Sequence, residues 1–144
     1  MLVNRLTVLI RIALGLVFLY SGFGKIADPN GFAVIVTNYR LLPQTLVWGT
    51  ALLLPWIEAT CGLALLCGRF EKGAALLVSL MMVVFIAVIL YNGYRGLNIA
   101  CGCFSLAARE PSSITLSTMR NLIILVAGLW ILVVSENKRF ALAN

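Results

Sequence analysis

Two cysteines separated by a single glycine occupy a short polar stretch between long apolar runs. Cys101 and Cys103 belong to Ala100-Cys101-Gly102-Cys103-Phe104-Ser105, and no other two of the four cysteines are as close in the sequence. Such a pair can close a strained, easily reduced disulfide ring, or bind a soft metal ion such as Cu(I) or Zn through its thiolates. It can also be two small residues of a turn with no redox role. We favour dithiol chemistry over a metal site, because the pair lies between two predicted membrane spans.

Two arginines flank the cysteine pair, Arg95 on one side and Arg109 on the other. Cationic side chains near a cysteine favour its thiolate form, which is the form that attacks a disulfide. The positions of Arg95 and Arg109 therefore mildly favour a reactive pair over a static one.

The composition predicts a membrane protein. The chain has 144 residues, of which 62% are hydrophobic, and its mean hydropathy is +1.04, whereas a soluble domain is about 45–50% apolar. The net charge is +6, but the Lys and Arg residues stand singly at the ends of apolar runs. That pattern indicates contact with lipid headgroups and excludes a basic nucleic-acid-binding surface. Because the chain contains no histidine, histidine-based proton transfer and metal ligation within it are excluded.

The apolar runs predict an all-α fold, a polytopic membrane four-helix bundle that forms a single integral membrane domain over residues 1–144. Each run has about the length that a spanning helix needs, roughly 20 residues. The four predicted spans cover about residues 6–23, 47–67, 74–91 and 114–135. After the first span, Asp28 can cap a helix that begins at Pro29. This segment is too short to cross the bilayer, so we expect an interfacial helix that ends near Pro43.

The distribution of Lys and Arg gives a weak prediction of orientation. It slightly favours placing both chain ends on the cytoplasmic side of a bacterial inner membrane. The Cys101–Cys103 loop would then lie on the outer side, where a thiol pair can remain oxidised.

Charged residues inside predicted spans are costly and are usually paired or functional. If the first two spans are antiparallel, Arg11 and Glu58 differ in depth by only about 6 Å, so we expect them to form an ion pair. The pair could fix helix register, or Glu58 could be a protonatable group beside a quinone or a proton path. Cys61 and Cys67 lie on nearly opposite faces of one helix and are expected to be inert core residues.

Several short motifs along the chain resemble those of a known family. In order, they are Arg11–Gly15, Gly24-Lys25-Ile26 followed by Asp28-Pro29, Tyr39–Pro43, Pro55–Glu58, Cys101–Phe104 and Arg120-Asn121. The combination resembles the MauE branch of the DoxX-like four-helix membrane proteins, and it covers nearly the whole chain. Ala100 and Ser105 depart from that pattern and leave both cysteines in place.

The resemblance implies an inner-membrane protein that works with a periplasmic thioredoxin-like partner in disulfide formation, as in methylamine dehydrogenase maturation. Cys101 and Cys103 would be the redox pair, and Arg11, Glu58 and Arg120 would be intramembrane polar positions. No residue identifies a cofactor, although a quinone between the helices is a candidate electron acceptor. The competing hypothesis is a non-catalytic subunit that anchors a larger redox or respiratory complex. In that case the cysteines would form a static disulfide.

Overall fold

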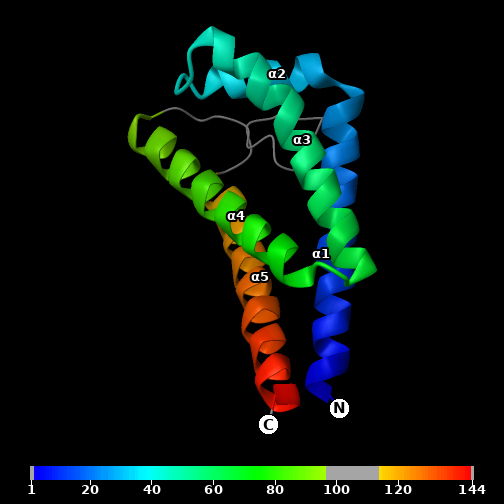
Figure 1. Cartoon of the computed structure of the whole chain (residues 1–144). Coiled ribbons are helices and arrows are strands. Elements are labelled where there is room, and N and C mark those ends of the chain that lie inside the picture. Colours follow the sequence, from blue (N-terminus) through cyan, green and yellow to red (C-terminus); the bar gives the residue numbers. More distant parts are fainter. Residues whose placement is uncertain (1, 97–113, 144) are drawn as a thin grey trace.

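A computed structural model describes residues 2–96 and 114–143, with side-chain environments for residues 4–96 and 114–135. These residues form five helices: α1 (Leu2–Ala27), α2 (Pro29–Asn38), α3 (Gln44–Cys67), α4 (Glu71–Tyr94) and α5 (Ile114–Ala143) (Figure 1). Four of them, all except α2, are long and apolar enough to cross a bilayer, with mean hydropathies between 1.7 and 2.9. This arrangement confirms the predicted all-α, four-span fold class.

The four long helices form two antiparallel pairs, α1 with α3 and α4 with α5. Both chain ends lie at one end of the bundle, and α2 lies across the opposite end (Figure 1). We refer to these as the terminal end and the α2 end. α3 and α4 join the two pairs through the short turn between Cys67 and Glu71 at the terminal end. There Trp130 of α5 also donates a hydrogen bond of 3.4 Å to the Thr7 hydroxyl of α1.

Glycines allow the backbones of α1 and α3 to approach closely. A Cβ atom added at Gly62 of α3 would lie 2.8 Å from the carbonyl oxygen of Gly15 in α1. A Cβ atom added at Gly22 of α1 would lie 2.9 Å from the carbonyl oxygen of Pro55 in α3. Without a strong hydrophobic drive between helices in lipid, such close packing of small residues is a main source of helix association.

We expect Gly62→Ala to destabilise the protein by about 1–3 kcal/mol, because the added methyl group would press on backbone atoms that cannot move away. Gly49→Ala, in the same helix, is the matched control, since no atom lies within 4 Å of its added Cβ. Gly49→Ala should leave the free energy of unfolding unchanged or raise it by about 0.5–1 kcal/mol. Thermal unfolding in detergent measures both variants, and equal melting temperatures would contradict the close approach.

Two contacts define the register between α4 and α5. A Cβ atom added at Gly128 of α5 would lie 2.7 Å from the Ser79 hydroxyl of α4, and one added at Gly93 would lie 3.4 Å from Ile114. Because α4 and α5 are antiparallel, these two contacts place Ile86 of α4 level with Asn121 of α5.

All four long helices contribute to one apolar core. Its buried members are Leu14, Phe18, Cys61, Leu65, Ala74, Ala75, Val78, Met82, Ile124 and Ile131. The rest of the long helices' surface is largely apolar and exposed, including Leu9, Leu53, Leu80, Ile123 and Val133. Such a surface requires lipid as its solvent, so the chain contacts membrane lipid directly.

The short helix α2 begins as the sequence predicts. The Asp28 carboxylate accepts a hydrogen bond of 2.9 Å from the backbone N–H of Gly31, and Pro29 is the first helical residue. Phe32, Ala33 and Val36 form the buried face of α2 and pack with Val47 and Ala51 of α3. The helix ends at Asn38, earlier than the expected end near Pro43, and Arg40 adopts a positive φ of 49° in the turn that follows.

Candidate functional site

A buried ion pair joins α1 to α3 within the membrane-spanning region. The Lys25 ammonium lies 2.6 Å from each oxygen of the Glu58 carboxylate, and the Ser21 hydroxyl donates to the same carboxylate at 3.2 Å. Both charged side chains are 3% exposed. A carboxylate and an ammonium are tolerated at such depth because each neutralises the other, and the carboxylate also accepts the hydrogen bond from Ser21.

Helix geometry explains why these two residues meet. Side chains on an α-helix point toward its N-terminus. α1 and α3 are antiparallel, and Lys25 lies on the α2 side of the level of Glu58. The Lys25 side chain therefore points toward the terminal end, where Glu58 lies, and the Glu58 side chain points toward the α2 end, where Lys25 lies.

The predicted Arg11–Glu58 pair is wrong. The Arg11 guanidinium instead donates to the Glu71 carboxylate at 2.8 Å and lies against Gly68, the residue that ends α3. Gly68 is ten residues beyond Glu58, which corresponds to about 15 Å along a helix. Arg11 therefore lies near the α3–α4 turn at the terminal end, whereas Glu58 lies near the middle of the bundle.

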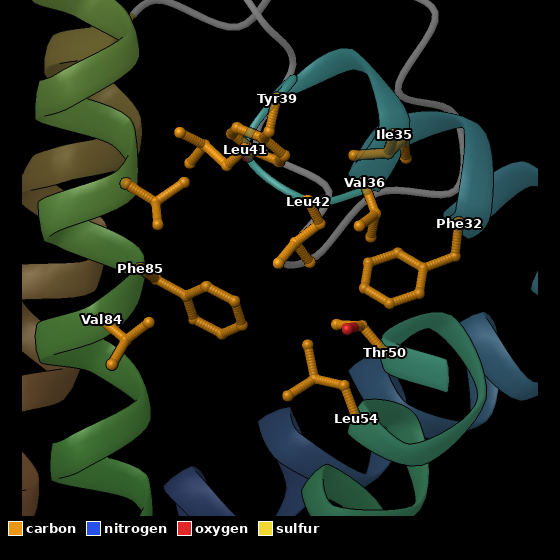
Figure 2. Close-up of a pocket in the computed structure, with 11 residues that line it drawn as sticks. Phe32, Ile35, Val36, Tyr39, Leu41, Leu42, Thr50, Leu54, Val84 and Phe85 are labelled. Atoms are coloured by element: carbon orange, nitrogen blue, oxygen red, sulfur yellow. The ribbon is translucent and has the colours of Figure 1, made fainter. Parts of the chain in front are cut away.

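An apolar cavity of about 270 Å³ lies beside the ion pair, between α2, α3 and α4. Figure 2 shows Phe32 of α2 and Phe85 of α4 pointing into it from opposite sides. The Lys25 ammonium lies 4.9 Å from the centre of the Phe32 ring, a distance at which cation–π attraction operates. Phe32 thus belongs to both the cavity wall and the surroundings of the ion pair. The remaining lining residues are Ile35, Val36, Tyr39, Leu41, Leu42, Thr50, Leu54, Val84 and Val88.

Buried polar side chains also lie between α4 and α5. Asn92 is 2% exposed and donates to the carbonyl of Val88 at 2.9 Å. Asn121 is fully buried, and within the described part of the chain neither its amide nitrogen nor its amide oxygen has a hydrogen-bond partner. Arg120, the residue before it, is half-buried. Unsatisfied buried amides are rare because each costs about 1–3 kcal/mol.

Among the remaining predicted site residues, the structure describes only Arg95. Cys101, Cys103 and Arg109 lie outside the described residues. Arg95, at the end of α4, is exposed, and its guanidinium lies 5.6 Å from the centre of the Tyr91 ring. The described residues contain no cluster of three or more side chains able to hold a metal ion.

The interpretation of the two helical cysteines is half right. Cys61 is buried in the core, whereas Cys67 is exposed at the end of α3. Cys67 is the last residue of α3, and it lies on nearly the opposite face of that helix from the buried Cys61, so it is not part of the core.

Sequence reasoning missed Lys25, Ser21 and Asn121 as parts of the polar interior. The first predicted span ended at Phe23 and left Lys25 outside it, but α1 continues to Ala27. A usable signal was present, because Phe18, Ser21 and Lys25 recur at helical spacing on one face. That face is the buried one.

The fold, the four apolar spans and the lipid-facing surface define this chain as a multi-pass helical membrane protein. The chain belongs to the MauE family, since the family model described as methylamine utilisation protein MauE matches residues 3–134. No solved structure matches it.

Three relatives carry the name methylamine utilization protein MauE. The protein of Paracoccus denitrificans is 32% identical over 121 residues, covering 83% of this chain and 64% of the relative. The protein of Methylophilus methylotrophus is 36% identical over 101 residues, covering 69% of this chain and 51% of the relative. The protein of Methylorubrum extorquens is 31% identical over 108 residues, covering 74% of this chain and 58% of the relative. The matched part of this chain thus spans between half and two thirds of the length of these relatives.

Proposed function

We propose that this chain is a membrane-embedded thiol–disulfide redox protein of the bacterial inner membrane. Cys101 and Cys103 cycle between dithiol and disulfide on the outer face, with both chain ends in the cytoplasm. A thiolate of a periplasmic thioredoxin-like partner attacks the Cys101–Cys103 disulfide, and the resulting mixed disulfide is resolved by the partner's second thiol. The partner leaves oxidised, and this chain is left with two thiols.

The observation that supports this proposal is the position of the helix ends on either side of the cysteines. α4 ends and α5 begins at the α2 end of the bundle, where Gly93 and Ile114 are in contact range. Cys101 is five residues and Cys103 seven residues beyond Gly96, so an extended chain reaches about 17 Å and about 25 Å, respectively. α4 has 24 residues and is therefore about 36 Å long. The covalent reach from Gly96 therefore supports a position for both thiols that is nearer the α2 end than the terminal end.

Membership of the MauE family supports an accessory role in thiol–disulfide exchange. The relatives are named for methylamine utilization, and we extend that role to this chain as part of the proposal. The work of such an accessory would be disulfide formation in a secreted redox enzyme. Two electrons then leave the Cys101–Cys103 dithiol and require an acceptor within the membrane, for which a quinone has the right chemistry.

Trapping of the mixed disulfide tests the proposal. The mixed disulfide is resolved by the partner's second thiol, so a thioredoxin-like partner whose second active-site cysteine is replaced by serine should stay covalently attached to this chain. We expect a reducible band of higher mass on a non-reducing gel of cells that carry this partner with the wild-type chain, and none with the Cys101→Ser/Cys103→Ser variant. Absence of the band with the wild-type chain would contradict the exchange and favour a scaffold subunit with a static disulfide.

A further inference from the structure

The cavity between α2, α3 and α4 lies in a wedge between two spanning helices. α3 and α4 are joined by a short turn at the terminal end and diverge toward the α2 end (Figure 1). Tyr39, Leu41 and Leu42, from the connection between α2 and α3, line the cavity at its wide end (Figure 2). Because α2 is too short to cross a bilayer, this connection lies near the membrane surface, and so does the wide end of the cavity.

The lining of the cavity calls for an apolar occupant. It is almost wholly apolar and contains no charged residue. A cavity of about 150 Å³ lined by Leu, Ile and Phe holds no water but accepts benzene, and this one is larger, at about 270 Å³. It is too small for a helix of a partner protein, whose diameter with side chains is about 10–12 Å. A single flexible hydrocarbon chain meets both conditions.

Arg40 provides an independent observation at the wide end of the cavity. The residues on either side of it, Tyr39 and Leu41, line the cavity, whereas Arg40 itself is exposed. Among the described residues its guanidinium has no ion-pair or hydrogen-bond partner. An unpaired cation therefore lies beside the apolar cavity, near the membrane surface.

The backbone conformation of Arg40 favours a role for its side chain. Among the described non-glycine residues, Arg40 alone has a positive φ, of 49°. Its N–H donates to the Thr37 carbonyl at 2.9 Å and closes the last turn of α2, a position at which glycine is the usual residue. Strained residues of this kind cluster at ligand sites. A guanidinium that binds a ligand would account for an arginine where glycine would be unstrained.

We propose that the cavity and Arg40 together bind one anionic phospholipid of the surrounding membrane. One acyl chain occupies the cavity, and the phosphate lies against the Arg40 guanidinium, whose planar donors suit phosphate oxygens. Binding of the lipid goes beyond the proposed thiol exchange and does not depend on it.

The charges at the α2 end favour an anionic headgroup over a zwitterionic one. The ammonium of a zwitterionic headgroup needs a carboxylate partner. Asp28 precedes the first residue of α2, and the ten residues of that helix place it about 15 Å from the connection that carries Arg40. Glu58 is buried and already paired with Lys25. The described residues therefore offer the phosphate a cation but offer an ammonium no nearby anion.

Native mass spectrometry of the delipidated full chain in detergent tests the proposal. The ligands are phosphatidylglycerol, phosphatidylcholine and diacylglycerol with identical acyl chains. We expect one phosphatidylglycerol to bind about tenfold more tightly than diacylglycerol, which lacks the phosphate, with phosphatidylcholine between them. Equal binding of the three ligands would overturn the proposal in favour of unselective lipid contact. No bound phosphatidylglycerol would overturn it outright.

Variants of Arg40 test the headgroup contact. Arg40→Gln should weaken phosphatidylglycerol binding about tenfold, whereas Arg69→Gln, which removes an exposed cation at the terminal end, should not. Arg40→Gly should weaken binding equally and leave the melting temperature of the lipid-free protein equal or higher, because glycine adopts a positive φ without strain. Unchanged binding in both Arg40 variants would assign Arg40 a purely structural role and overturn the proposal.

A matched pair of variants on α4 tests the location of the acyl chain. Val88 is half-buried and lines the cavity, so Val88→Trp should abolish selective phosphatidylglycerol binding by filling it. Val83 is exposed and does not line the cavity, so Val83→Trp should bind like the wild type. Equal binding by the two variants would overturn the assignment of the acyl chain to this cavity.

Discussion

Replacement of Lys25 by Met is expected to destabilise the protein by about 3–5 kcal/mol, because the Glu58 carboxylate is left buried without a counter-charge. Lys25 and Glu58 are each 3% exposed and lie 2.6 Å apart, so neither side chain can reach water after the loss of the other. Unfolding in detergent, followed by circular dichroism, measures the effect.

A double variant separates the charge effect from the loss of packing. In Lys25→Met/Glu58→Met the buried charges are both gone, and well-packed apolar replacements of a buried pair are often neutral or stabilising. We therefore expect the double variant to recover most of the lost stability. Arg11→Met is the matched control, since the Arg11–Glu71 pair is 20% and 25% exposed and should contribute less than about 1 kcal/mol. Lys25→Met and Arg11→Met variants of equal stability would contradict the buried pair.

Truncation of Phe32 has the second large expected effect. Phe32 is 5% exposed, belongs to the α2–α3 core cluster and lies against Lys25. Phe32→Ala should cost about 3–5 kcal/mol, as for other buried phenylalanines. Phe32→Leu keeps most of the apolar contact but removes the ring face, and should cost less, about 0.5–2 kcal/mol from the lost cation–π attraction.

Phe70 provides the control for this series. It lies in the turn before α4 and is 73% exposed, so Phe70→Ala should change stability by less than about 0.5 kcal/mol. If Phe32→Ala unfolds at the same denaturant concentration as Phe70→Ala, α2 is not packed on α3 as described, and the cavity loses one wall.

Local signals in the sequence were sufficient for the main elements of the fold. Apolar length predicts the four spans, because lipid demands continuous apolar helices. Asp28 and Pro29 predict the start of α2, because a capping carboxylate and a fixed φ act within a few residues. These features depend on neighbours in the sequence, and the structure has each of them.

Features that depend on the register between helices could not be predicted in the same way. The depth of Arg11 relative to Glu58 was estimated from the expected ends of the spans, and an error of a few residues at those ends exchanged the partners of both residues. The cavity and the position of Asn121 depend on how α2, α3, α4 and α5 pack together. No pattern along a single helix encodes that packing.

We propose that a redox-active thiol pair faces the outer side of the membrane at the α2 end. Differential alkylation of intact cells with a membrane-impermeant maleimide tests it most directly, before and after mild reduction. Cys67, which is exposed at the end of α3 next to the terminal-end turn, is an internal reporter of the opposite face. It should react only after the cells are lysed.

We expect label to appear on Cys101 and Cys103 in intact cells after reduction and not before. Replacement of both cysteines by serine should remove this label, and Cys67 should remain unlabelled until lysis. Label on Cys67 in intact cells, with none on Cys101 or Cys103 under any condition, would contradict this orientation of the chain. The thiol pair would then lie on the cytoplasmic side, away from any periplasmic partner.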